Sequence, residues 1–538
     1  MVKKYFFIFL IVISSLVLYL KTLLPGHEFH DIGELQTAAC TLGIAHPPGY
    51  PTYIILGKIF TLIPISNPAW RVNFMSAFFS ICSLILFFKI TKKVFRSGPA
   101  AFFAALILAF SQNFWYYSLV AEMYSLNVFF MNLFVYLVIN KFPNQVRKLN
   151  LKLYYFFFFL LGLAQGNHRN ITIITPLLVL YLILLKLKVF INLKNVLKFC
   201  LLFILGLGIY LFLPLRSLQN PYLNYAKPIT WKNFKYLVTA EQFRFLMFTV
   251  PLKRLVSERV EMFLAFVKEQ FLLPGILLVL LGLGFLLYKK KFKVAALFLL
   301  IFLLNTFVWL SYNTNDVYRY LTPSYVILAF FIGGGISIFF TLVKKVKKNL
   351  LQLLLNLLIS IPLLYFVFFL IKANYKKVDQ SQNNGAYAWG MEVLKSLKPN
   401  AVIISHWGYS PALWYLQGCE GVRPDIIIAD DRVRVDENWG SAAETVKLFI
   451  NTRPVYIIYA ENYIDDVQQA GYGLIKLKNV IEVIEAPRPN RPRIQSMIYQ
   501  LFSDYKKLKS CRSENHLTFG PRYPAVPIKS GRIFAKAD

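Results

Sequence analysis

The sequence predicts a polytopic α-helical membrane protein of about eleven spans, followed by a C-terminal soluble α/β domain. Hydrophobic residues make up 57% of the chain, and the mean hydropathy is +0.52. Charged residues make up 16%, compared with roughly 25% in soluble domains. Several apolar runs approach the ~20 residues that cross ~30 Å of hydrocarbon as a helix.

The expected spans follow one another with short polar connections. They cover residues 5–24, 70–90, 99–116, 124–140, 152–167, 171–187, 197–214, 271–288, 293–311, 321–343 and 350–371. No small-residue cleavage site follows Leu20. The first run is therefore expected to remain as a span rather than to act as a signal peptide.

Basic residues set the expected orientation, with the N-terminus in the cytoplasm. Lysine and arginine then gather in the inner connections, as the positive-inside rule requires. These connections contain Lys3 and Lys4, Lys89–Arg96, Lys141–Lys152, Lys186–Lys198, Lys289–Lys293 and Lys344–Lys348. This placement accounts for the net charge of +33 without nucleic-acid binding. We expect a multi-pass protein among membrane lipids, in the cell membrane of a prokaryote or the ER membrane of a eukaryote.

Acidic residues segregate to the other side. All nine acids before residue 372 fall in outer connections on this topology. The positive-inside rule does not explain acids, so the segregation favours a functional outer face. The odd span number also places the tail, residues 373–538, outside, after a membrane domain of residues 1–372.

Two outer loops are long. Residues 25–69 contain His46-Pro-Pro-Gly-Tyr-Pro51, which forbids a regular helix, and then a short apolar stretch at 53–63 that suits an interfacial helix. Residues 215–270 are rich in aromatic and basic residues and predict surface helices near 231–247 and 252–269.

The tail has the pattern of a soluble α/β domain. Apolar strand-like runs at 401–405, 425–429 and 454–460 alternate with helical patterns at 384–397, 410–417 and 441–451. The tail has no GxGxxG or P-loop motif, so a nucleotide site is not supported. Of the five cysteines, Cys419 and Cys511 are candidates for a disulfide.

The first outer loop holds the leading catalytic candidates. Asp31 and Glu34 are three residues apart and would share one face of a helix. A carboxylate beside a membrane cavity suits a general base acting on an acceptor hydroxyl. Glu122, in the second outer loop, stands at the mouth of a span, where ionisable residues are functional by default. The plainer alternatives are an exposed acidic loop and a side chain that reaches to the membrane interface.

Metal binding is a further use of this loop. His27, His30 and Asp31 would suit a divalent cation such as Mg²⁺ or Mn²⁺, although no metal site is the default expectation. In the tail, His406 and the segment 430–432 follow strand-like runs. A packing role is at least as good an explanation for them.

Cations on the outer side predict a phosphate site. Arginine binds phosphate through two parallel hydrogen bonds. With His46 of the first loop, the candidate donor-phosphate residues are Arg71, His168, Arg169, Arg216 and Arg319. Any single one is also explained by lipid-headgroup anchoring, and Arg319 is also explained by pairing with Asp316.

Several motifs resemble those of glycosyltransferase family 117, long described as a domain of unknown function, whose eukaryotic relatives include an ER protein O-mannosyltransferase. The similar segments are DIGEL at 31–35, TLGIAHPPGYP at 41–51, AWRVN at 69–73, VAEMYSLN at 120–127, GNH at 166–168 and YLFLPLR at 210–216. The resemblance covers about residues 25–225. One departure is Arg169-Asn170 after Asn167-His168, where small or apolar residues are expected, so the cationic role of this turn is in doubt.

The resemblance implies a GT-C fold, whose first outer loop carries the catalytic carboxylate. It implies transfer of a sugar, with inversion, from a polyprenyl-phosphate donor to a protein or glycan acceptor at the outer or luminal face. Asp31 would then be the base, and Glu34 and Glu122 its supporting groups.

Two other classes of function compete with a transferase. A transporter or lipid flippase would have broken spans, charges near the midplane and repeated halves. The ionisable residues cluster instead at one face, and the sequence contains no repeat. A non-catalytic receptor or scaffold would leave the crowded first loop without a purpose.

Overall fold

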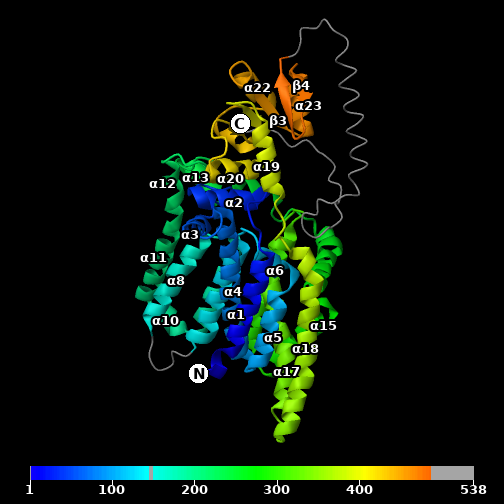
Figure 1. Ribbon diagram of the computed structural model, residues 1–538. Coiled ribbons are helices and arrows are strands. Elements are labelled where there is room, and N and C mark those ends of the chain that lie inside the picture. Colours follow the sequence, from blue (N-terminus) through cyan, green and yellow to red (C-terminus); the bar gives the residue numbers. More distant parts are fainter. Residues whose placement is uncertain (1, 144–149, 486–538) are drawn as a thin grey trace. The chain divides into compact units, whose positions relative to one another are not determined.

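The computed structural model describes residues 2–143 and 150–485, and long helices form most of this part of the chain (Figure 1). A helix coincides with each expected span. They are α1 (Val2–Thr22), α4 (Pro68–Phe95), α5 (Gly98–Ala109), α7 (Tyr124–Tyr136), α8 (Leu151–Gln165), α9 (Arg169–Leu185), α11 (Leu193–Leu207), α15 (Val260–Tyr288), α16 (Phe292–Leu310), α17 (Thr322–Val343) and α18 (Asn349–Val378).

Length and composition qualify seven of the described helical segments as membrane spans, and α5, α8 and α9 are shorter apolar helices. The predicted class of polytopic helical protein is thus confirmed, whereas the number of eleven spans stays a prediction. The π-helical turn η1 (Leu137–Lys141) extends α7, and the 3₁₀ turn η2 (Gly208–Leu211) and α12 (Phe212–Ser217) extend α11.

Small residues let these helices approach closely. A Cβ added to Gly282 of α15 would lie 1.8 Å from the Phe331 carbonyl oxygen of α17. A Cβ added to Gly162 of α8 would lie 2.1 Å from the Phe203 carbonyl oxygen of α11. Such backbone contact is typical of helices that associate in membranes, where burial from water contributes little.

Short helices form in the connections between the long ones. The loop at residues 25–69 contains α2 (His30–Thr41) and α3 (Pro51–Thr61), so a helix is present at the apolar stretch 53–63, and its interfacial position stays a prediction. The remaining short helices are α6 (Gln112–Tyr117), α10 (Leu187–Ile191), α13 (Trp231–Val238), η3 (Glu241–Leu246), α14 (Leu252–Arg254), η4 (Leu255–Arg259) and η5 (Val317–Arg319). The expected surface helix at 252–269 consists of α14, η4 and the first part of α15, and a break inside α15 at Leu272, where φ is 55° and ψ is 177°, separates it from the rest of α15.

A five-stranded sheet follows the last long helix. Its strands are β1 (Val402–Ile404), β2 (Ile427–Ala429), β3 (Val455–Ile458), β4 (Gly473–Lys476) and β5 (Val480–Ile484), in the order β2-β1-β3-β5-β4. The first three are parallel and match the three expected strands, whereas β3, β5 and β4 pair antiparallel. The accompanying helices are α19 (Gly385–Ser396), α20 (Ser410–Glu420), α21 (Asp431–Asp436), α22 (Ala442–Phe449) and α23 (Glu461–Gln469).

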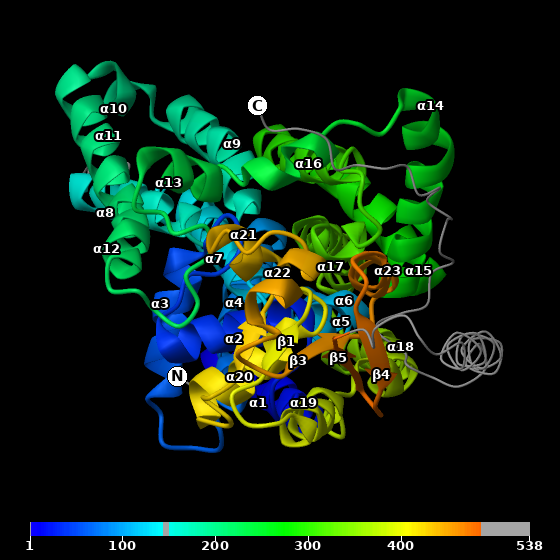
Figure 2. The same cartoon turned by 90° about the horizontal axis from the view of Figure 1, so that it is seen from above.

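The sheet with its helices (residues 385–484, the sheet domain) lies on α2 and the residues around it (Figures 1 and 2). The Ala69 N–H donates to the Tyr415 hydroxyl of α20 at 3.0 Å, and the His27 ring stacks on the Tyr415 ring at 4.6 Å. The Asn383 amide donates to the buried Glu28 carboxylate. The described residues up to 485 belong to one compact unit, and α18 continues past residue 372, so the division at 372/373 stays a prediction.

The cysteine prediction falls partly outside the described residues, because Cys511 lies there. The Cys419 thiol lies against the Cys40 thiol instead, where α20 packs on α2.

Candidate functional site

The first two turns of α2 carry Asp31 and Glu34. A Cβ at Gly33 would lie 2.0 Å from the Glu28 carbonyl oxygen, so only glycine allows the chain to fold back over this turn. Asp31 lies in the first turn, where the positive end of the helix dipole stabilises a carboxylate. Glu34 follows one turn later and is buried.

Glu34 holds His46 through two contacts. The His46 backbone N–H donates to Glu34 Oε1 at 2.9 Å, and Nδ1 of the ring pairs with Glu34 Oε2. The other ring nitrogen lies 3.0 Å from the Tyr50 hydroxyl. Burial opposes a charge on the ring, but the charge and hydrogen bond of Glu34, followed by the charge of Asp31, outweigh it and raise the pKa of His46 to about 9. His46 is therefore an imidazolium at neutral pH.

Arg319 joins three carboxylates from distant parts of the chain. Its Nη1 lies 3.0 Å from Asp31 and 3.9 Å from Glu122, and its Nη2 lies 3.0 Å from Asp316. The expected pairing with Asp316 is present, but it is one of three. The guanidinium therefore fixes the loop before α17 against the start of α2.

The carboxylates around Arg319 differ in protonation. Burial acts to raise the pKa of Asp31, but His46, Arg319, His30 and a hydrogen bond from Trp407 together lower it. Burial, and then the charge of Asp31, raise the pKa of Glu122 to about 8. At neutral pH Asp31 is thus ionised and partly exposed, whereas Glu122, only 3% exposed, is mostly a neutral acid.

Asp31 and His46 line a cavity of about 720 Å³. Its other walls come from the loop at residues 215–270, the start of α9, the end of α16 with the connection to α17, and the sheet domain. The polar and charged side chains that line it include Arg169, Gln242, Arg244, Thr314, Asp316, Asp430, Asp431 and Arg432. Arg169 and Arg244 are exposed, and the Arg169 guanidinium donates to the Val238 carbonyl at 3.1 Å.

His168 belongs to the aromatic wall of the same cavity. It stacks on Tyr320 at 5.9 Å and on Trp309 at 6.0 Å between ring centroids. Burial, assisted by the neighbouring Arg169, lowers the pKa of His168 to about 3. The sequence analysis expects a cation here, whereas the structure gives a neutral ring, because the side chain is enclosed among aromatic rings.

Two predicted phosphate ligands lie elsewhere. Arg71 donates to the carbonyls of Ile65 and Ser66 at 2.7 and 2.8 Å. Arg216 donates to the carbonyls of Leu42 and Thr41 at 2.8 and 3.1 Å, at the C-terminal end of α2. Neither residue is part of the cavity lining. Both guanidinium groups hold loop backbone in place.

The sheet domain contributes residues that the sequence analysis leaves open or misses. Trp407 and Asp430 line the cavity, and Asp430 accepts a hydrogen bond from the Ser410 hydroxyl at 2.7 Å. Arg432 lies over the Tyr225 ring at 5.0 Å. Their positions just after β1 and β2 are the signal available in the sequence, because the ends of parallel strands are common places for sites. Arg244 carries no such signal.

The metal alternative is not favoured by the described residues. His27 stacks on Tyr415 instead of converging with His30 and Asp31. Within residues 2–143 and 150–485, no group of three His, Cys, Asp or Glu side chains is arranged to hold a metal ion.

Part of the site lies in a region that matches a family model. The model of the Protein O-mannosyl-transferase TMEM260 N-terminal domain matches residues 31–190. The chain is 28% identical over 456 residues to Protein O-mannosyl-transferase TMEM260 of Mus musculus, and 26% identical over 477 residues to the protein of that name from Dictyostelium discoideum. These matches cover 80% and 78% of this chain, but the chain spans only 63% and 56% of the relatives. The family resemblance expected from the motifs is confirmed.

Two solved structures share the fold. ArnT from Cupriavidus metallidurans bound to undecaprenyl phosphate has a TM-score of 0.57 at 12% identity, covering 90% of this chain and 100% of ArnT. An Archaeoglobus fulgidus oligosaccharyltransferase in complex with Zn and sulfate has a TM-score of 0.50 at 13% identity, covering 89% and 74%. At this identity the likeness concerns the fold alone, and it confirms the predicted GT-C class.

Proposed function

We propose that the protein is a membrane glycosyltransferase that moves a sugar from a polyprenyl-phosphate donor to an acceptor hydroxyl. One observation carries the proposal. The carboxylate of Asp31, which is ionised and partly exposed, lines a cavity of about 720 Å³ together with arginine side chains and aromatic rings. The names of the mouse and Dictyostelium relatives support mannose as the sugar and a protein as the acceptor. The undecaprenyl phosphate of ArnT supports a lipid-linked donor.

Asp31 takes the proton from the acceptor hydroxyl as its oxygen attacks the anomeric carbon. The new carbon–oxygen bond forms while the bond from that carbon to the phosphate oxygen breaks, so the configuration inverts. Polyprenyl phosphate leaves with the bonding electrons and one additional negative charge. Asp31 ends protonated and returns the proton to water.

Cations near the cavity stabilise that leaving charge. Arg169 and Arg244 are exposed in the cavity lining, where a phosphate can reach them, and Arg169 also donates to the Val238 carbonyl, whereas Arg71 and Arg216 lie outside the lining. Arg319 keeps Asp31 in place, and His46 adds a positive charge that keeps Asp31 ionised. Neutral Glu122 suits a hydrogen-bond donor to the sugar or to Asp31.

The basic connections support a cytoplasmic N-terminus, and hence a site and a sheet domain on the extracytoplasmic side. A lipid carrier explains why the site lies beside membrane helices, because the donor stays dissolved in the bilayer while its phosphate and sugar reach the cavity.

The test is sugar transfer by the purified full chain in lipid vesicles, offered polyprenyl-phosphate mannose, other polyprenyl-phosphate sugars or a nucleotide sugar, with peptide acceptors. Transfer from a lipid-linked donor by the wild type, and its loss in Asp31→Asn, would support the proposal. Transfer from the nucleotide sugar alone would contradict the donor class. Flux of labelled lipid across the vesicles without any product would favour the transporter instead.

A further inference from the structure

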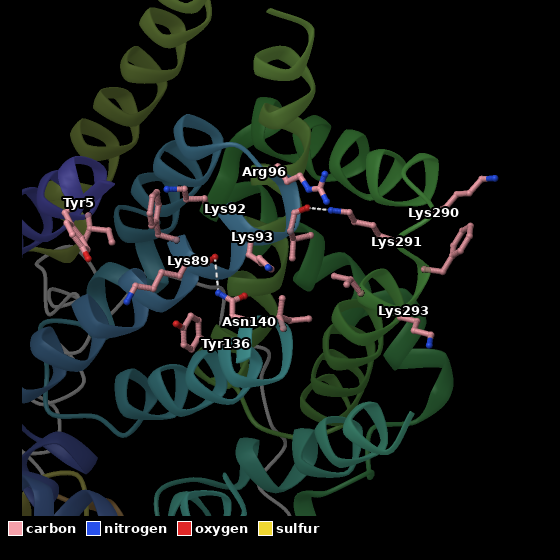
Figure 3. Close-up of a pocket in the computed structure, with 16 residues that line it drawn as sticks. Tyr5, Lys89, Lys92, Lys93, Arg96, Tyr136, Asn140, Lys290, Lys291 and Lys293 are labelled. Carbon is pink, nitrogen blue, oxygen red and sulfur yellow. Dashed lines mark hydrogen bonds between the residues drawn. The ribbon is translucent and has the colours of Figure 1, made fainter. Parts of the chain in front are cut away.

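A second large pocket lies at the opposite end of the helices from Asp31, where α1 begins and α4 ends (Figures 1 and 3). Its volume is about 1000 Å³. Side chains from the start of α1, the end of α4, the end of α7 with η1, and the connection between α15 and α16 line it. Nothing in the proposed transfer reaction uses this pocket.

The lining of this pocket has a large excess of positive charge. Of the side chains that line it, seven are cationic: Lys89, Lys92, Lys93, Arg96, Lys290, Lys291 and Lys293. Among the described residues, none of the lining side chains is acidic. Figure 3 shows that these cations come from two separate segments on either side of one hollow. Like charges held together in this way favour an anionic ligand.

Several of these cations are held in place. The Lys291 ammonium donates to the Val94 carbonyl oxygen, which fixes the α15–α16 connection against the end of α4. Burial, followed by the neighbouring charges of Arg96 and Lys289, lowers the pKa of Lys291. Lys89 lies over the Tyr136 ring at 5.8 Å. Lys89 and Lys291 are therefore held at the ends of the helices, and the other five cations of the lining are exposed beside them.

Apolar side chains complete the pocket lining. A lining that is both basic and apolar favours an amphiphilic ligand. Ile8, Phe88, Ile139, Phe292 and Val294 line the pocket beside the lysines. The same helices continue from this pocket into the apolar part of the bundle (Figure 1). A ligand with an anionic head and hydrocarbon chains would match both parts of the lining, whereas a free anion would match only one.

We propose that this pocket binds the phosphate headgroup of an anionic membrane lipid, and that the lysines of the α4 end and the α15–α16 connection surround that phosphate. The headgroup would neutralise the cluster and hold the two segments together. The site is separate from the transfer site and does not depend on the proposed function.

The experiment measures lipid binding to the purified full chain in detergent by native mass spectrometry, with phosphatidylglycerol as the probe, phosphatidylcholine as the neutral comparison and inorganic phosphate as the free anion. The pocket variant is Lys89→Gln/Lys93→Gln/Lys293→Gln. The matched control is Lys198→Gln/Lys194→Gln/Lys188→Gln. It removes the same charge from another expected inner connection, and its Lys198 also lies over an aromatic ring, Tyr155, at 6.0 Å.

We expect the wild type and the control to bind phosphatidylglycerol in preference to phosphatidylcholine. The pocket variant should bind it ~10-fold or more weakly, since each basic residue near an anionic lipid contributes a factor of about five. Equal weakening by both variants would show only the general attraction of a basic membrane face and would overturn the proposal. Equal binding of both lipids would also overturn it. Saturable binding of inorganic phosphate without preference for phosphatidylglycerol would assign the pocket to a free anion and refute the lipid.

Discussion

Replacing Asp31 by asparagine separates its chemical role from its structural one. Asparagine keeps the shape of the side chain and a hydrogen bond to Arg319, but it cannot accept the acceptor's proton. General-base catalysis contributes typically 10²–10⁴-fold. We therefore expect kcat to fall about 10³-fold in Asp31→Asn, which corresponds to about 4 kcal/mol of activation free energy.

The structure limits the other consequences of this change. Arg319 keeps Asp316 at 3.0 Å and Glu122 at 3.9 Å, so the substitution does not leave an unpaired buried cation. Asp31 and Arg319 are 24% and 21% exposed, and ion pairs with this access to water contribute about 1 kcal/mol or less to stability. The unfolding temperature and the donor KM should therefore change little.

Asp316→Asn is the matched control. It removes a carboxylate from the same guanidinium at the same distance of 3.0 Å, but from a position outside the start of α2. The assay is the initial rate of sugar transfer in vesicles at saturating donor and acceptor, with protein amounts equalised. We expect Asp316→Asn to lose less than about tenfold, because positioning is disturbed and the base remains. Equal losses in the two variants would refute the base role and would leave Asp31 as a partner of Arg319 only.

Three further predictions concern the site. The double variant Arg169→Gln/Arg244→Gln should raise the donor KM by about tenfold or more, since charge-assisted hydrogen bonds contribute about 1.5–3 kcal/mol. The control Arg216→Gln should lower the unfolding temperature and leave the donor KM unchanged. An unchanged donor KM in the double variant would contradict a role of Arg169 and Arg244 in donor binding. Glu122→Gln should keep the transfer rate at pH 7 within about threefold of the wild type, because the wild-type side chain is already mostly protonated. Removal of a general base would lower the rate by far more. The pKa of Glu122 rises from 4.5 when unfolded to about 8 when folded, so the wild type should lose stability as pH rises between these values, and Glu122→Gln should not; parallel melting curves across that pH range would refute this. Gly33→Ala should lower the stability by about 1–3 kcal/mol through overpacking against the Glu28 carbonyl, and an unchanged melting temperature in the presence of lipid would count against the close contact.

The membrane part was predictable because each span is a long apolar run between charged connections. The segment 99–116 shows the limit of that signal, since α5 ends at Ala109 and α6 begins at Gln112. The strands β4 and β5 were not predicted, because a charged side chain interrupts or ends each apolar run (Lys476 in β4, Glu482 in β5) and β4 is exposed in part.

In the candidate site, the acidic residues were easier to predict than the basic ones. Asp31, Glu34 and Glu122 stand out in a sequence because charge at the end of a span is costly. Arginine side chains are long, and the sequence does not say whether they end at a backbone carbonyl or in a cavity. Arg71 and Arg216 bind carbonyls, while Arg244 lines the cavity without any motif to mark it. Arg319 was predicted as a phosphate ligand and instead lies among three carboxylates.

The contact between α20 and α2 has a consequence for how the protein can be divided. Pro411 of α20 lies 3.1 Å from where a Cβ of Gly33 would be, and Tyr415 accepts a hydrogen bond from the Ala69 N–H at the start of α4. The sheet domain therefore packs against α2, the helix that carries Asp31, and supports it from one side. A truncation after α18 would remove this support together with Trp407. The membrane part alone should therefore lose sugar transfer even when it stays folded. A separately expressed sheet domain should restore sugar transfer only if it binds to α2 again.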